Sequence, residues 1–222
     1  VYLVSMPSRF SSNHSKSDAR DLANNLNANF DTIDIDDLFE KYLDTLHNKF
    51  KGMESNVAEE NIQSRIRGNI LMAFSNKFGC LVLSTGNKTE LALGYCTLYG
   101  DMSGGLSAIG DLSKTEVYNL AKWKNKVSNN IIPDHSITKQ PSAELAPNQV
   151  DPFDYDLISP IVDKIILGED ISDDIKKNDL GDIRTRISRN EHKRRQAAPV
   201  LRISKKAFGM GRRIPIVNHF DE

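Results

Sequence analysis

Short apolar runs alternate with amphipathic stretches along the first half of the chain. Residues 1–6 and 80–83 are almost continuously apolar, which is typical of strands, and the second run is apolar on both faces, as in a buried parallel sheet. Residues 30–35 alternate imperfectly and predict another short strand. Helical spacing of apolar residues follows at 15–26, 36–50, 57–77 and 88–99. Strands separated by helices predict an α/β fold with a doubly wound parallel sheet.

Capping patterns indicate where several of these helices begin. A Ser or Asn followed three residues later by an acid occurs at Ser15, Asn56, Asn87 and Ser113. The apolar face of the 36–50 helix is predicted as Leu38, Phe39, Tyr42, Leu43 and Leu46. That of the 57–77 helix is predicted as Ile62, Ile66, Ile70, Met72, Ala73 and Phe74.

The second half is less regular. Residues 100–110 contain four glycines and predict a mobile loop, and residues 124–156 are polar and proline-rich, which favours a long loop. Short helices are expected at 113–123, 160–167, 172–177 and 182–196, followed by an irregular basic tail.

Composition narrows the class of protein. The chain has 222 residues, 39% of them hydrophobic, and a formal net charge of −1, so it can build a core and has no whole-chain field that would attract nucleic acid or membranes. The two cysteines, Cys80 and Cys96, are too few for a disulfide framework and fit a reducing, cytoplasmic setting. No apolar run approaches the roughly 20 residues of a membrane span.

Three places are candidates for chemistry. The turn 84–90 follows a predicted strand, where Thr85 could meet a nucleotide and Glu90 a hard cation such as Mg²⁺. A capped helix start explains the same residues, and pattern alone favours that explanation. Residues 189–213 carry nine Lys or Arg and one acid, which suits phosphates, a nucleic-acid surface or a solvated helix face. Asn61 and Arg65 share one helix face and either grip a polar ligand or are simply exposed.

Three stretches together resemble one family. Residues 6–26 (beginning MPSRFSS), 60–123 (containing STGNKTELALGY and YGDMSGG) and 188–216 (containing NEHKRRQAAP) resemble NAD synthetases, specifically the synthetase domain of the glutamine-dependent form. The resemblance implies an ATP pyrophosphatase with a Rossmann-like, adenine nucleotide alpha hydrolase-like sheet. It also implies that ATP adenylates the carboxylate of deamido-NAD, and that ammonia then displaces AMP to give NAD, with Mg²⁺ assisting.

The resemblance assigns a role to particular positions. ATP binding is implied for Met6, Arg9, Thr85, Lys114 and Ser142. Contact with deamido-NAD is implied for Asn61, Arg65, Glu90, Asp101, His192 and Lys193. Glu90 is the implied Mg²⁺ ligand, and Lys193 with His192 are the implied catalytic residues.

The resemblance also raises expectations about the whole protein. The family's phosphate loop, S-G-G-x-D-S, is not found in these residues, so we expect residues 1–222 to be one synthetase domain without its first strand, phosphate loop and first helix, and inactive alone. Residues 189–222 are its basic C-terminal segment. We expect a glutamine amidase domain upstream, a homodimer, and no nucleic-acid or membrane partner. Another ATP pyrophosphatase, or a nucleic-acid-binding module at 189–213, are the alternative functions.

Overall fold

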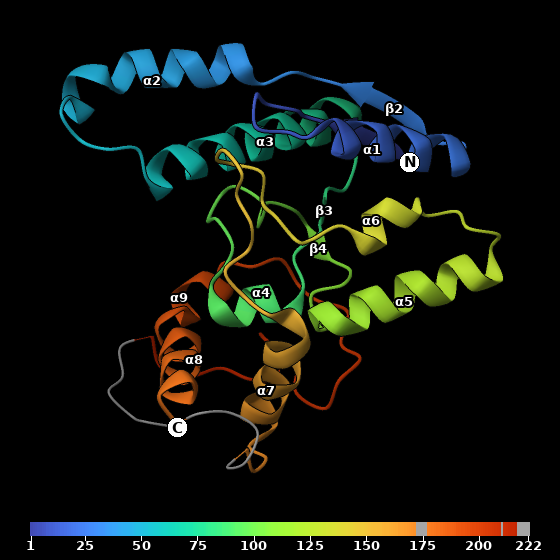
Figure 1. Ribbon diagram of the computed structural model, residues 1–222, viewed down its shortest axis with the longest axis vertical. Coiled ribbons are helices and arrows are strands. Elements are labelled where there is room, and N and C mark those ends of the chain that lie inside the picture. Colours follow the sequence, from blue (N-terminus) through green and yellow to red (C-terminus); the bar gives the residue numbers. More distant parts are fainter. Residues whose placement is uncertain (172–176, 210, 217–222) are drawn as a thin grey trace. The chain divides into compact units, whose positions relative to one another are not determined.

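The computed structural model describes residues 1–171, 177–209 and 211–216 (Figure 1). The chain divides into two compact units. The first comprises Val1–Leu71 and Tyr118–Pro152, and the second comprises Met72–Val117 and Phe153–Glu222. Each unit contains parallel strands and helices, so the predicted α/β class is confirmed.

The first unit is built on a pair of parallel strands. β1 (Tyr2–Ser5) pairs with β2 (Asn29–Thr32), with Tyr2 opposite Asn29, and α1 (Asn13–Asn25) connects them. The other helices that lie wholly or partly in this unit are α2 (Asp36–Phe50), α3 (Val57–Phe78), α5 (Lys114–Val127) and α6 (Asp134–Thr138).

A small apolar core joins α2 to α3. It consists of Ile35, Phe39, Ile62 and Ile66, and the partly buried Leu43 is among the residues packed against it. The strand–helix junction places Ile35 in this core, so the buried stripe of α2 runs through Ile35, Phe39 and Leu43.

Two sequence predictions for this unit are wrong in detail. Leu38 and Tyr42 are about half exposed, at 47% and 49%, so they do not belong to the buried face of α2. The N-cap of α1 is Ser12 rather than Ser15, because the Ser12 side chain accepts from the Ser15 amide and so satisfies the first turn.

The second unit contains another parallel pair. β3 (Leu83–Ser84) pairs with β4 (Leu106–Ser107). Its helices are α4 (Lys88–Leu93), α7 (Tyr155–Leu167), α8 (Lys177–Arg189) and α9 (Glu191–Arg194), and α4 contacts the other three. The core between these helices includes Leu91 and Ala92 of α4, Ile161 and Ile166 of α7, and Ile187 of α8.

Several predicted elements of this unit differ in the structure. The 80–83 run contributes only Leu83 to β3, and Leu81 and Leu83 are exposed, so within the described residues this run is not a strand buried on both faces. The glycine-rich 100–110 segment, predicted as a loop, contains the two-residue strand β4. α4 ends at Leu93 rather than residue 99, because Gly94 takes a left-handed conformation. A Cβ at this position would also collide with the Asn190 side chain.

The later helices also differ from the prediction. α7 begins at Tyr155 rather than residue 160, because the Asp154 side chain caps its first turn ahead of Pro160. The helix predicted at 182–196 is two helices separated at Asn190. The helix predicted at 172–177 lies outside the described residues, apart from Lys177, where α8 begins.

Two further observations concern membrane crossing and the cysteines. Within the described residues, no helix combines the length and apolar character that crossing a membrane requires. Cys80 and Cys96 are both free thiols.

The core of the second unit predicts that two isoleucines contribute differently to the free energy of unfolding. Ile166 is 1% exposed and Ile203 is 63% exposed. Ile166→Ala should lower the free energy of unfolding by about 2–5 kcal/mol through lost burial and a cavity, and Ile203→Ala by less than about 0.5 kcal/mol. Urea unfolding of both variants measures the difference, and equal losses would show that Ile166 is not part of a packed core.

Candidate functional site

The segment that follows β1 carries two of the predicted ATP residues. Met6 is half-buried and packs against the core of the first unit, so its side chain has a structural role in addition to any contact with ligand. Arg9 is exposed, and its guanidinium forms ion pairs with Asp36, at 3.3 Å, and with Glu40. Both partners lie in the first two turns of α2, which fixes the chain at this point.

A pocket of about 280 Å³ opens beside this segment in the first unit. Its walls include Met6, Ser15, Arg67 and Glu144. The Arg67 Nε atom donates to the Met6 carbonyl oxygen at 2.9 Å, and burial lowers the pKa of this guanidinium. The volume of the pocket is close to the lower end of the range of small-molecule sites, which begins at about 300 Å³.

Arg67 was not among the residues selected from the sequence. Its signal was a cationic side chain set between Ile66 and Gly68, which are both buried, on the helix that carries Asn61 and Arg65. Asn61 is half-buried and Arg65 is exposed, so the two predicted deamido-NAD residues differ in accessibility although they share a helix.

Ser142 lies in the segment after α6, and its hydroxyl forms hydrogen bonds within that segment. Ser142 Oγ donates to the Gln149 carbonyl oxygen at 2.5 Å and accepts from the Glu144 amide at 3.1 Å. The Ser142 hydroxyl, which the resemblance assigns to ATP, therefore also stabilises the backbone conformation of residues 142–149.

In the second unit, the turn after β3 forms the predicted capping box. The Asn87 side chain accepts from the Glu90 amide at 3.1 Å, and the Glu90 carboxylate accepts from the Asn87 amide at 3.1 Å. Thr85 precedes this turn and is exposed. Residues 84–90 thus form the capped helix start that was the alternative to a ligand site. Thr85 is nevertheless accessible to a ligand.

The remaining oxygen of Glu90 faces a cation. Lys114 Nζ lies 2.8 Å from Glu90 Oε1 and 5.0 Å from the centre of the Tyr155 ring. Lys114 belongs to the first turn of α5, so two residues that the resemblance assigned to ATP and to Mg²⁺ are in direct contact.

Mg²⁺, which the resemblance implies, needs oxygen ligands. Among the described residues, no group of three or more His, Cys, Asp or Glu side chains could hold a metal ion. Mg²⁺ often binds through one carboxylate together with substrate phosphates and water. Glu90 offers one such carboxylate, and its Oε1 is paired here with the Lys114 ammonium.

Asp101 and Lys193 meet the same short stretch of backbone after α4. Asp101 is exposed, and its Oδ1 accepts from the Thr97 amide at 2.7 Å. Lys193 Nζ donates to the carbonyl oxygens of Gly94 and Cys96 at 2.7 and 2.8 Å. His192 is exposed, and its Nδ1 lies 2.9 Å from the Arg189 carbonyl oxygen.

A buried ion pair fixes the helix that carries Lys193. Arg194 and Glu191 are both 2% exposed in their side chains and lie 3.2 Å apart. Arg194 also donates to the carbonyl oxygens of Leu91 and Ala92, at 3.2 and 3.1 Å, and its guanidinium lies 4.8 Å from the Phe208 ring centre. The basic cluster is therefore not simply a solvated face.

Comparison with known proteins decides the family. The sequence model of a family described as NAD synthase matches residues 1–197. The chain belongs to the NAD synthase family. It is 47% identical to a glutamine-dependent NAD(+) synthetase of Synechocystis sp., over 98% of this chain and 40% of that relative.

One solved structure supports this assignment, and a second shares the fold. The chain is 39% identical, with a TM-score of 0.61, to a glutamine-dependent NAD+ synthetase of Acinetobacter baumannii in complex with ADP, over 97% of this chain and 40% of that one. A glutamine-dependent NAD(+) synthetase of Cytophaga hutchinsonii, 24% identical, shares the fold with a TM-score of 0.76, over 98% of this chain and 38% of that one. This NAD synthase chain thus spans about 40% of the length of the curated relatives it matches.

The buried pair at α9 leads to a prediction. Glu191→Gln leaves the Arg194 guanidinium buried without a counter-charge, so we expect the free energy of unfolding to fall by about 3 kcal/mol. Glu169→Gln, at an exposed position, is the matched control and should change it by less than about 0.5 kcal/mol. Urea unfolding tests this, and a Glu191→Gln protein as stable as the control would rule out the pair as the anchor of α9.

Proposed function

We propose that this chain provides the synthetase part of an enzyme that amidates deamido-NAD to NAD, using ATP and releasing AMP and pyrophosphate. The match of residues 1–197 to the NAD synthase family is the observation that carries the proposal. The proposal includes an acyl-adenylate intermediate. It also includes a doubly wound, Rossmann-like sheet of the adenine nucleotide alpha hydrolase type for the complete domain, completed by the family's first strand and phosphate loop.

The chemistry explains why such residues are needed. A carboxylate is a poor electrophile at neutral pH, whereas its mixed anhydride with AMP reacts with neutral ammonia. Negative charge develops on the phosphates as pyrophosphate leaves, and fixed cations near that charge lower the barrier. Bound Mg²⁺ would offset charge on the same phosphates.

Glu90 and Lys114 suit the ATP side of this reaction. Their ion pair holds two opposite charges at the start of α4 and α5. In the proposed complex Lys114 binds the ATP phosphates, and Glu90 is the protein ligand of Mg²⁺ and lies beside deamido-NAD. Each side chain thus exchanges one opposite charge for another, which avoids leaving either of them half-buried and unpaired.

Lys193 and His192 suit the reacting carboxylate. Lys193 is half-buried, and its ammonium is supported by two backbone carbonyls, so it is preorganised and needs little rearrangement to approach an oxyanion. Asp101 shares the same backbone stretch through Thr97, and we assign it to the nicotinate side of deamido-NAD. Met6, Arg9, Thr85 and Ser142 complete the proposed ATP contacts, and Asn61 with Arg65 the proposed contacts to deamido-NAD.

We propose glutamine as the source of nitrogen, delivered by an amidase domain of the native protein, because the relatives from Synechocystis and Acinetobacter are described as glutamine-dependent. We also propose a homodimer, and that residues 1–222 alone do not turn over.

The first experiment measures NAD formation by the full native polypeptide, supplied with deamido-NAD, ATP and Mg²⁺. Glutamine and ammonium are compared as nitrogen donors, and AMP and pyrophosphate are quantified. NAD formed from glutamine supports the complete proposal, whereas NAD formed from ammonium alone would reject the glutamine assignment. Absence of NAD with both donors would reject the function.

Lys193 provides the sharpest test of the catalytic assignment. Lys193→Met removes the ammonium but keeps much of the side-chain volume, and we expect kcat to fall about 100-fold because one transition-state cation is lost. The free energy of unfolding should fall by only about 1–2 kcal/mol, from the two lost hydrogen bonds.

The control for this variant is Lys205→Met, an exposed lysine in the same basic segment. It should keep both kcat and stability. A Lys193→Met enzyme with unchanged kcat would remove Lys193 from the reaction and leave it a purely structural residue.

A further inference from the structure

The segment between α6 and α7 is folded tightly on itself where it borders the pocket of the first unit. Ser142 Oγ bonds to the Gln149 carbonyl, and the Leu145 amide donates to Gln149 Oε1 at 2.8 Å. Glu144 has a φ of +51°, a left-handed conformation that is unfavourable for a residue with a side chain. Such a conformation persists only where surrounding contacts hold it, so the anchors of Glu144 are informative.

One anchor joins the segment to α3. Gln63, which is fully buried, donates through Nε2 to the Leu145 carbonyl oxygen at 2.8 Å. Gln149 Nε2 donates to Glu60 Oε2 at 3.1 Å. These bonds hold the part of the segment that follows Glu144.

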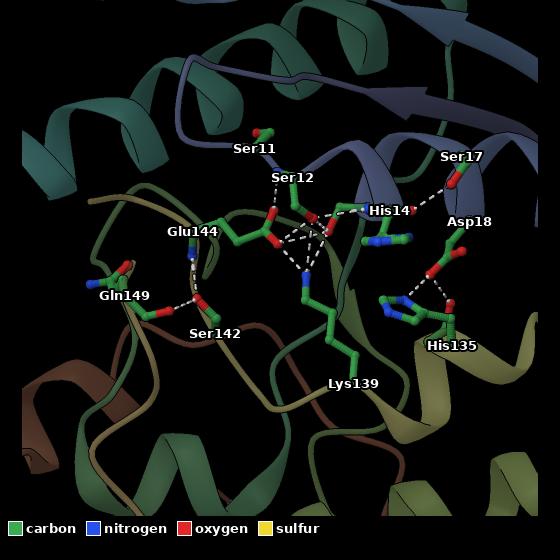
Figure 2. A network of polar contacts seen from close by, with 12 residues as sticks. Ser11, Ser12, His14, Ser17, Asp18, His135, Lys139, Ser142, Glu144 and Gln149 are labelled. Carbon is green, nitrogen blue, oxygen red and sulfur yellow. Dashed lines mark hydrogen bonds and ion pairs between the residues drawn. The ribbon is translucent and has the colours of Figure 1, made fainter. Parts of the chain in front are cut away.

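The second anchor is the Glu144 carboxylate, which is bound at the start of α1 (Figure 2). It accepts from the Ser12 amide at 3.2 Å, from the Ser12 hydroxyl at 2.8 Å and from the Ser15 hydroxyl at 2.9 Å, and it pairs with Lys139. Lys139 Nζ also lies 2.8 Å from Ser15 Oγ. We call Ser12, Ser15, Lys139 and Glu144 the clasp.

The clasp holds its carboxylate in the charged form. Burial raises the pKa of Glu144, but hydrogen bonds from Lys139, Ser12 and Ser15 outweigh burial, and the net pKa lies below its usual value. A carboxyl that stays ionised at neutral pH cannot donate a proton to a substrate. Glu144 lines the pocket together with Arg67. Since it does not act as an acid, it contributes to the shape of the pocket wall.

A carboxylate in the wall of a nucleotide pocket would repel phosphates if it were not neutralised. Lys139 and the amide end of α1 neutralise Glu144 before any ligand arrives. Groups of the protein itself thus neutralise the Glu144 carboxylate. Such a carboxylate is suited to positioning neighbouring segments.

We propose that Glu144 is a positioning residue for ATP, which acts by fastening the 139–149 segment to the start of α1 and so fixing the pocket wall that it forms with Arg67. This inference rests on the proposed function, and it assigns the pocket beside Met6 to the nucleoside part of ATP. Without the clasp the wall relaxes and ATP binds weakly, while the residues proposed to act on the carboxylate of deamido-NAD are unaffected.

The test uses Glu144→Gln in the full native polypeptide. The amide keeps the size of the side chain but loses the charge that pairs with Lys139. We expect KM for ATP to rise about tenfold, equivalent to about 1.4 kcal/mol of binding, with kcat and KM for deamido-NAD changed less than about twofold. Glu54→Gln, at an exposed position between α2 and α3, is the matched control and should leave all three constants unchanged.

A double-mutant cycle separates the clasp from a general loss of stability. Lys139→Met alone should raise KM for ATP to a similar extent, and the double variant should be no worse than either single one, because both changes break one unit. Fully additive effects would overturn the clasp. The exposed Lys51→Met is the control for the lysine change.

Direct ATP binding, measured by titration calorimetry, distinguishes this inference from the proposed function. If wild type forms NAD and Glu144→Gln keeps the wild-type KM and Kd for ATP, the inference fails and the function stands. If wild type binds ATP but forms no NAD, the function fails, and the inference is then judged on whether Glu144→Gln raises the Kd about tenfold. Wild type that binds no ATP would overturn both, and a uniform fall in kcat with unchanged KM for ATP would also reject the positioning role.

Discussion

The second unit depends on how the carbonyl oxygens at the end of α4 are satisfied. A helix leaves its last carbonyls without partners inside the helix, and here they lie in a packed core. Arg194 donates to the Leu91 and Ala92 carbonyls, and Lys193 donates to the Gly94 carbonyl just beyond the helix. Two cations therefore lie at the negative end of the helix dipole, where both hydrogen bonding and electrostatics favour them.

This arrangement ties the proposed catalytic residue to the fold. Glu191 balances the buried charge of Arg194, and the short helix α9 holds Lys193 next to it. Gly94 allows the close approach, because a Cβ there would collide with Asn190. The same contacts that stabilise the unit thus set the position of the Lys193 ammonium relative to the backbone of residues 94–97.

Glu90 shows how a structural and a functional explanation can both hold. One of its oxygens completes the capping box at the start of α4, and the other faces Lys114. A carboxylate held by a helix cap has few conformations available, which favours precise placement of a charge. In the first unit Glu144 is held in a comparable way at the start of α1, although it lies far from that helix in sequence.

The sequence by itself determined the class of elements, the starts of α2, α3, α4 and α5, and the family. Capping boxes at Asn87 and Ser113 formed as predicted, and the Glu59 carboxylate accepts from the Asn56 amide, because each of these contacts joins residues three apart. α2 has the predicted bounds, since local apolar spacing is sufficient for a long helix. The candidate turn at 84–90 and the basic cluster were also visible, because short motifs carry them.

Only the tertiary structure decided which of these residues have partners distant in sequence. No local pattern links Glu144 to Ser12, Lys114 to Glu90, or Arg194 to the end of α4. The same limit explains two errors: the exposure of Leu38 and Leu83 and the strand within the glycine-rich segment depend on which segments pack beside them. The early end of α4 is different, because the local stop signal of Gly94 was present in the sequence. Periodicity specifies a face, but burial of that face and the pairing of charges are settled by contacts between segments far apart in the chain.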